Sequence, residues 1–128
     1  MILDSSAIIA IVLREAGWLE LVSKLASATA SAVGATTLAE SGLVLTVKMG
    51  RRAPVVLSRF VQEAGLDVIP FAEAHWRVAM DAYARFGKKR HPANLNFGDC
   101  LTYAVARLAD HPLLFVGSDF SKTDLPAA

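Results

Sequence analysis

Short apolar segments alternate along the chain with longer segments of helical periodicity. The apolar segments that fit strands lie at residues 1–3, 28–34, 66–71 and 113–116. The spacing of apolar residues predicts helices at 5–14, 17–27, 36–50, 54–64, 72–87 and 97–109. Strands that are separated by helices pair in parallel, and helices then cover both faces of their sheet. The alternation therefore predicts a three-layer α/β/α fold, with a short central parallel sheet flanked by helices.

The size and composition of the chain fit a cytoplasmic protein with one domain spanning residues 1–128. Of its 128 residues, 54% are hydrophobic, which is enough to form a core without covalent cross-links. The single cysteine, Cys100, excludes a disulfide framework and a zinc site built from several thiolates. The longest apolar run near the start covers only residues 7–13, and no basic segment precedes it. We therefore expect neither a signal peptide nor a membrane span.

The net charge of +1 conceals two basic clusters. The first has no acid between Glu40 and Glu63 and contains Lys48, Arg51, Arg52 and Arg59. The second has no acid between Asp81 and Asp99 and contains Arg85, Lys88, Lys89, Arg90 and His91. Such clusters can be ordinary solvated surface, but they also attract phosphate backbones. They are weak support for a nucleic-acid partner.

Four acidic residues fall where the predicted strands end. Asp4 follows the first strand, and Asp119 follows the last. Glu40 and Asp99 lie near the starts of the helices predicted at 36–50 and 97–109. Because sites in parallel sheets form at the carboxyl ends of the strands, these four side chains are expected to meet there.

Three of these acids, and also Asp124, have a structural alternative in helix capping. Asp4 can cap the helix that follows it. The spacing of a capping box recurs at Thr37 to Glu40, Asn96 to Asp99 and Ser121 to Asp124. Two observations favour a site over caps alone. Glu40 shares a helical face with Leu43, Val44 and Val47, which predicts that it points inward, and gathered carboxylates repel one another unless a cation neutralises them.

The chemistry of the acids selects the ion. Carboxylate oxygens without a thiolate or a pair of imidazoles suit Mg²⁺ or Mn²⁺, and the three histidines are scattered along the chain. An ion held in this way can polarise a phosphoryl oxygen and activate water. With basic clusters nearby, a phosphodiester is the expected substrate.

Four segments carry a resemblance to a known family. They are ILDSSAIIAIVL at 2–13, TLAES at 37–41, GKKRHPANLNFGDCLTYAVA at 87–106 and LLFVGSDFSKTDL at 113–125. Together they resemble PIN-domain ribonucleases, specifically the VapC-type toxins of bacterial toxin–antitoxin pairs. Two departures are Val116, where many relatives have a polar or basic residue, and Ser118, where they have Asn or Asp.

The resemblance implies a PIN fold, an endoribonuclease activity and a role for each acid. Asp4, Glu40, Asp99 and Asp119 match the acidic quartet that holds Mg²⁺ or Mn²⁺ and activates water for RNA cleavage. Ser6 matches a small hydroxyl residue of the family, and Asp124 matches a further acid seen in many members. The resemblance also implies a cognate antitoxin and a homodimer.

The remaining motifs are interpreted from the residues themselves. Lys88, Lys89, Arg90 and His91 lead directly to the helix that carries Asp99, so they are expected to bind the RNA backbone beside the site. Cys100 is expected to be buried and not to act as a nucleophile. Trp18 and Trp76 are expected in the core, the latter on a stripe with Ala72, Ala79, Tyr83 and Phe86. Phe97 fits either core packing or base stacking.

Two other classes of function remain open on the sequence alone. A phosphoacceptor signalling domain would have adjacent acids after its first strand, where this chain has Asp4 and Ser5. A non-catalytic interaction module would use the apolar helical segments at 7–13 and 38–49. Metal-dependent cleavage of RNA separates both from a nuclease.

Overall fold

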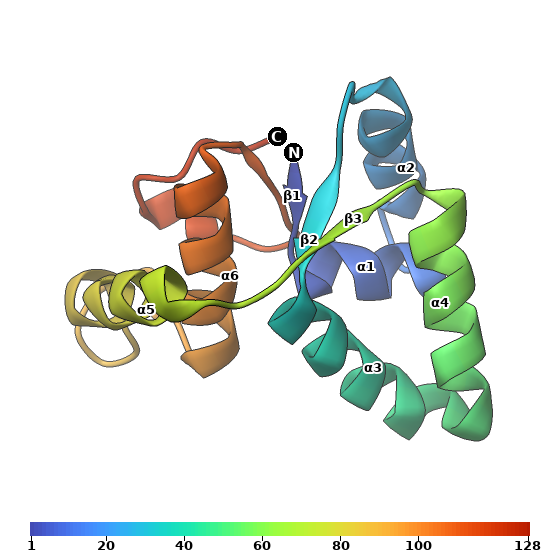
Figure 1. The fold of residues 1–128 in the computed structure, drawn as a ribbon, viewed down its shortest axis with the longest axis horizontal. Helices are drawn as coiled ribbons and strands as arrows, with labels where there is room; N and C mark the ends of the chain where they lie inside the picture. The colour runs from blue at the N-terminus through green and yellow to red at the C-terminus, as the bar shows by residue number, and fades with distance from the viewer.

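A four-stranded parallel sheet with helices on both faces forms the centre of the computed structural model, which describes residues 1–128 (Figure 1). The strands are β1 (Ile2–Leu3), β2 (Ala32–Gly34), β3 (Asp67–Ile69) and β4 (Leu113–Leu114), in the order β3-β2-β1-β4. The helices are α1 (Ser5–Val12), α2 (Trp18–Ser27), α3 (Ala35–Met49), α4 (Ala53–Glu63), α5 (Glu73–Phe86) and α6 (Phe97–Ala109). The predicted three-layer α/β/α fold is confirmed.

Neighbouring residues of β1 and of the edge strand β4 separate the two halves of the core. Ile2 and Leu113 pack in a cluster with α5 and α6, whereas Leu3 and Leu114 pack in a second cluster with α1, α2 and α4. Successive side chains of a strand point to opposite faces, so even two-residue strands supply both clusters. Figure 1 shows α5 and α6 on one side of the sheet and α1, α2 and α4 on the other.

Helix α3 joins the two halves at the carboxyl edge of the sheet. It begins directly after β2 and packs against both α1 and α6 (Figure 1). The hydroxyl oxygens of Thr37 on α3 and Thr102 on α6 lie 3.0 Å apart in a buried hydrogen bond. This bond fixes α3 relative to the helix that carries Asp99.

Two predicted faces differ from those in the structure. On α5, Ala79 and Phe86 are buried, but Trp76 and Tyr83 are 44% and 42% exposed, so the prediction that Trp76 is a core residue is wrong. The stripe winds past the contact that α5 makes with α6, and no further layer covers its remainder. Trp18 is half-buried, with the Arg14 guanidinium 5.3 Å from its ring centroid.

On α3, Leu43 and Val47 are 72% and 85% exposed. The buried face of this helix contains Thr37, Ser41 and Leu45 instead. The expectation that Glu40 shares a core face with Leu43 and Val47 is therefore wrong, because that face is open to solvent. No helix in the structure is both long and apolar enough to cross a bilayer.

Candidate active site

Asp4 is buried at the end of β1, with 4% of its surface exposed. Its backbone is extended, and its Oδ2 accepts hydrogen bonds from the Ser6 N–H at 3.1 Å and the Ser6 hydroxyl at 2.6 Å. The predicted cap on α1 is therefore present. The second oxygen, Oδ1, is buried without any hydrogen-bond partner. An unpaired buried carboxylate oxygen is costly in free energy. Capping therefore explains the position of Oδ2 but gives no reason for burying Oδ1.

A second orphaned oxygen lies at the same edge of the sheet. Thr36 Oγ1, in the first turn of α3, is the other buried side-chain polar atom without a partner. Both orphaned oxygens therefore follow the carboxyl ends of neighbouring strands, β1 and β2. Buried polar groups are nearly always hydrogen-bonded, so this edge stands out from the rest of the structure.

Ser6 links Asp4 to the segment after β4. Its hydroxyl donates to Asp4 and accepts a hydrogen bond from the Val116 N–H at 3.0 Å. Only the backbone of Val116 takes part, so its apolar side chain does not disturb the link. Ser6 therefore holds the Asp4 carboxylate in place against the segment after β4.

Asp99 forms the predicted capping box at the start of α6. Its Oδ2 accepts from the Asn96 N–H at 3.0 Å, and Asn96 Oδ1 accepts from the Asp99 N–H at 2.9 Å. Burial raises the pKa of Asp99 to about 6, although the Asn96 hydrogen bond lowers it, and the charges of Asp4, Asp119 and Glu40 raise it further. The four acids therefore lie close enough for the charge of one to affect another.

Glu40 reaches this cluster across the start of α6. Its carboxylate lies against Gly98, where an added Cβ would overlap it. The predicted capping box from Thr37 to Glu40 is absent, because α3 begins at Ala35 and the Thr37 hydroxyl bonds to Thr102. Glu40 is therefore directed at the helix that bears Asp99.

We expect a Gly98→Ala substitution to lower activity while leaving the fold stable. The new methyl group would displace the Glu40 carboxylate, and for a member of the predicted acidic quartet a misplacement of about 1 Å is expected to cost on the order of a hundredfold in rate. Alanine is also favoured over glycine within a helix by roughly 1 kcal/mol. Thermal unfolding and single-turnover cleavage of RNA measure the two effects separately.

Gly42→Ala is the matched control for this prediction. An added Cβ at Gly42 meets only Leu57 Cδ2, at an ordinary 3.5 Å. It should gain similar stability in α3 without any loss of rate. Equal rates in the two variants would show that the position of Glu40 does not matter for cleavage.

The two acids near the C-terminus lie in different surroundings. Asp119 is exposed, just before the short 3₁₀ turn η2 (Phe120–Lys122), and its charge reaches Asp99. Asp124 instead accepts a hydrogen bond from the Tyr103 hydroxyl at 2.6 Å and pairs with Arg85 at 2.9 Å. Burial would raise the pKa of Asp124, but these two bonds outweigh it and lower the pKa. Asp124 therefore fastens the C-terminal segment to α5 and α6, and the predicted cap from Ser121 to Asp124 is absent.

The donor atoms at this edge are carboxylate oxygens. Cys100 is buried, as expected, and burial together with the charge of Asp99 raises the pKa of its thiol to about 11, which disfavours the reactive thiolate. His75 and His91 accept hydrogen bonds from backbone N–H groups of their own segments. No three acidic, histidine or cysteine side chains converge on one point as ion ligands. The repulsion among the carboxylates and the orphaned Asp4 oxygen nevertheless fit a site for a hard cation.

Comparison with known proteins assigns the family. The model of the PIN domain family matches residues 1–125. The chain is a PIN-domain protein. It is 45% identical over 126 residues to Ribonuclease VapC36 of Mycobacterium tuberculosis, covering 98% of this chain and 91% of the relative. It is 42% identical over 132 residues to Ribonuclease VapC28 of the same organism, covering 100% of this chain and 97% of the relative. These relatives place the PIN domain within the VapC group.

Solved PIN-domain structures have the same fold. VapC20 of M. tuberculosis, described as a Sarcin-Ricin loop cleaving toxin, superposes with a TM-score of 0.81 at 19% identity, over 99% of this chain and 97% of its own. VapBC2 from Rickettsia felis, bound to a DNA fragment from its promoter, gives 0.77 at 14% identity, over 99% and 96%. At these identities the similarity concerns the fold alone.

Sequence reasoning missed two features of this PIN domain. Gly98 makes room for Glu40, and the hydrogen bond between Thr37 and Thr102 fixes the crossing of α3 and α6. One signal was available for Gly98. Glycine is unfavourable in a helix, so its presence two residues after a cap indicates a close approach by another group.

Proposed function

We propose that this PIN-domain protein is a metal-dependent endoribonuclease and the toxin of a toxin–antitoxin pair. Its relatives VapC36 and VapC28 are named ribonucleases, and VapC20 is described as a Sarcin-Ricin loop cleaving toxin. The observation that carries the proposal is the buried, unpartnered Asp4 oxygen, at an edge where burial and the charges of Asp4, Asp119 and Glu40 raise the pKa of Asp99. We place the activity in the cytoplasm, where RNA is available.

Asp4, Glu40, Asp99 and Asp119 would hold the Mg²⁺ or Mn²⁺ ion. When bound, such an ion polarises a phosphoryl oxygen and lowers the pKa of water, which supplies the nucleophile for phosphodiester hydrolysis. The chain itself positions these acids. Ser6 orients Asp4, Asn96 orients Asp99, and Gly98 admits the Glu40 carboxylate.

The direct test is cleavage of RNA by the purified chain with Mg²⁺, with Mn²⁺ and with EDTA. We expect cleavage with either ion and none with EDTA. A phosphoacceptor domain or an interaction module would leave RNA intact under all three conditions. Matched reactions with Asp99→Asn exclude a contaminating nuclease, because that variant should be inactive.

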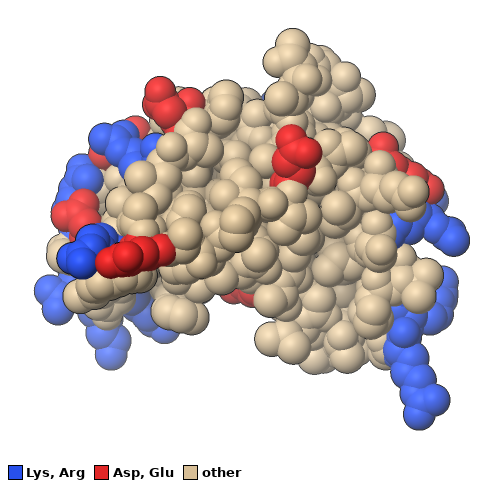
Figure 2. Space-filling model, in the orientation of Figure 1, with Lys and Arg blue, Asp and Glu red and all other residues tan.

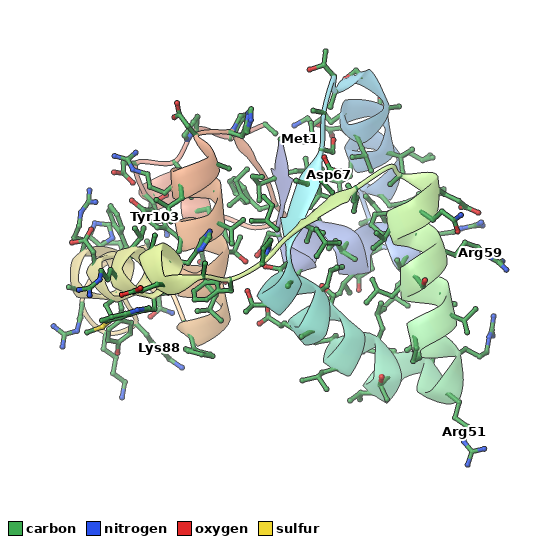
Figure 3. The ribbon with its side chains drawn as sticks, in the orientation of Figure 1. Met1, Arg51, Arg59, Asp67, Lys88 and Tyr103 are labelled. Carbon is green, nitrogen blue, oxygen red and sulfur yellow. The ribbon has the colours of Figure 1, made fainter.

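Basic side chains offset the repulsion between an acidic site and RNA. Figure 2 shows lysine and arginine side chains gathered toward the two ends of the molecule. Lys88, Lys89 and Arg90 are exposed in the loop that leads into α6, and Lys88 and Arg59 project from opposite ends (Figure 3). We propose that Lys88, Lys89 and Arg90 contact the RNA backbone. His91 is turned inward, edge-on to Phe86, and shapes the loop instead.

Replacing Lys88, Lys89 and Arg90 together by alanine should weaken RNA binding and flatten its dependence on salt. Each lost phosphate contact lowers the slope of log K against log salt by roughly 0.7 for single strands. The single-turnover rate at saturating RNA should change little, because these cations attract the strand and do not react with it. Filter binding over a range of salt concentrations measures the slope.

A triple variant of Arg51, Arg52 and Arg59 removes the same charge from the other end of the molecule. These residues lie on η1 (Gly50–Arg52) and α4, away from α6 (Figure 3). We expect a much smaller change in the slope. Equal losses in both triple variants would mean that total charge attracts RNA, without a particular contact surface.

We also propose a cognate antitoxin and a homodimer. A solved structure that superposes with a TM-score of 0.69 is described as a toxin–antitoxin complex from Klebsiella pneumoniae. On α3, Leu43, Val44 and Val47 form an exposed apolar face on the same side of the helix as Glu40. A partner that covers this face would lie beside the site. Light scattering of the isolated chain tests the dimer, and a strict monomer at all concentrations would contradict it.

A further inference from the structure

An apolar groove lies between α5 and the start of α6. Its volume is about 700 Å³, and the residues lining it include Trp76, Met80 and Tyr83 on α5 and Phe97 on α6. The three α5 residues follow one another at spacings of four and three, so they share one face of the helix. Phe97 is 79% exposed and Met80 is 65% exposed. Trp76 and Tyr83 belong to the stripe that periodicity assigns to the core, yet both are exposed.

Cations surround this groove. Lys88 is among its lining residues, and none of them is acidic. The Arg77 guanidinium lies 4.5 Å from the Trp76 ring centroid, and the Arg90 guanidinium lies 5.4 Å from that of Tyr83. The one acid paired with these cations is Glu73, 3.8 Å from Arg77 and itself exposed. An apolar floor of aromatic rings with a cationic rim is complementary to stacked bases joined by phosphates.

The groove and the acidic cluster lie on two sides of one helical turn. Phe97, Cys100 and Leu101 face the groove, whereas Asp99 is close in charge to Asp4 and Glu40. Successive helical residues turn by about 100°, which places Asp99 on the far side of α6 from the groove. A strand that crosses the start of α6 would therefore place a phosphodiester at the acids and a neighbouring base in the groove.

We propose that this groove binds an unpaired nucleobase of RNA next to the phosphodiester that is cleaved. The inference rests on the proposed ribonuclease function and adds a subsite to it. Asn96 is the one amide side chain among the lining residues, and its carbonyl oxygen already caps Asp99. Stacking on Trp76, Tyr83 or Phe97 therefore dominates, so the groove selects unpaired bases over paired ones without strong preference among them.

Tryptophan fluorescence can report this contact directly. The chain has two tryptophans, so a Trp18→Phe background leaves Trp76 as the sole reporter. In EDTA, to prevent cleavage, this protein is titrated with a short single-stranded oligoadenylate, with the same sequence in a duplex, and with a single strand of abasic ribose phosphates. We expect the single-stranded oligoadenylate to quench Trp76 fluorescence, and the duplex and the abasic strand to leave it unchanged. We also expect the oligoadenylate to bind roughly tenfold more tightly than the abasic strand.

Variants of Phe97 and Met80 assign the effect to the groove. Phe97→Ala should remove most of the preference for the oligoadenylate over the abasic strand, and Phe97→Tyr should retain it. Met80→Glu, at a second exposed position, should weaken binding of the oligoadenylate by adding a negative charge to the groove. Leu19→Ala, at a residue on α2 that is 65% exposed, is the matched control and should bind as the parent does.

The outcomes separate this subsite from the proposed function. Equal affinity for the base-containing and abasic strands, with no quenching, would overturn the subsite even if Mg²⁺-dependent cleavage is observed. Base-dependent quenching without cleavage in Mg²⁺ or Mn²⁺ would support the groove and overturn the ribonuclease proposal. If Phe97→Ala leaves RNA binding unchanged and converts a dimer to a monomer, the groove is a protein interface and the inference is wrong.

Discussion

Asp99→Asn should abolish RNA cleavage and, without metal, make the protein more stable. Loss of one carboxylate from the ion site should lower the rate by roughly a hundredfold or more. Asparagine keeps an oxygen that can accept the Asn96 hydrogen bond, so the start of α6 is preserved. Removing the negative charge avoids the cost of burying it and also relieves repulsion with Asp4, Asp119 and Glu40. For a group that is half exposed, we expect about 1–2 kcal/mol of added stability at neutral pH.

The difference in stability between the wild type and Asp99→Asn should depend on pH. Asp99 has a pKa of about 6 in the folded protein, against 3.8 for an ordinary aspartate. The folded state therefore binds the proton more tightly, and ionisation of Asp99 reduces the stability of the wild-type protein as pH rises from about 4 to about 6. The asparagine of the variant does not titrate. The two proteins should be equally stable below about pH 4. The variant should reach its full stability advantage above about pH 6.

Urea unfolding in EDTA across this pH range measures the difference. Asp110→Asn is the matched control, because Asp110 is exposed and has a positive φ of 55°, which asparagine also tolerates. Its stability should follow that of the wild type at every pH. A destabilised Asp99→Asn protein would instead mean that the carboxylate stabilises the protein more by capping α6 than it destabilises it by repelling the other acids.

Mg²⁺ or Mn²⁺ should raise the melting temperature of the wild-type protein. At a concentration a hundredfold above Kd, an ion that binds only the folded state adds about 2.7 kcal/mol. For a domain of this size that corresponds to an increase on the order of 10 °C. Asp4→Asn should lose this response, because it removes the buried carboxylate while asparagine remains a good cap for α1.

Differential scanning fluorimetry at matched ionic strength measures this response without any RNA. Potassium chloride controls for general screening of the acids. The same increase in melting temperature in wild type and Asp4→Asn would locate the ion elsewhere on the molecule. No increase in either protein would contradict the metal site itself.

The best-predicted elements are the helices whose first or last residues are marked by capping residues. Helix α6 runs from Phe97 to Ala109, as expected, because Asn96 and Asp99 mark its start. Gly50 marks the end of α3 in the same way, with a φ of 66° that favours glycine. The meeting of the acids at the carboxyl edge of the sheet also followed from topology alone, because it depends on strand direction and not on side-chain detail.

The predictions that were wrong concern which apolar helix faces are covered by a neighbouring helix. Periodicity shows that Trp76 and Tyr83 share a stripe with Phe86, but it does not show where the adjoining helix stops covering that stripe. Similarly, Leu43 and Val47 share a face with Glu40, and that face is open. The approach of Glu40 to Gly98 depends on how α3 crosses α6, which no local pattern encodes.

The order of the strands has a consequence during synthesis. β1 lies between β2 and β4, and the Asp4 N–H bonds to the Leu114 carbonyl, although 110 positions separate these residues in the chain. A nascent chain that has emerged only as far as α5 lacks β4, Asp99 and Asp119. The acidic cluster can therefore assemble only after β4 has been synthesised and has paired with β1, which is a contact between the two ends of the chain. Under the proposed ribonuclease function, an unfinished copy lacks two of the four acids and would be inactive, so only finished molecules would need an antitoxin.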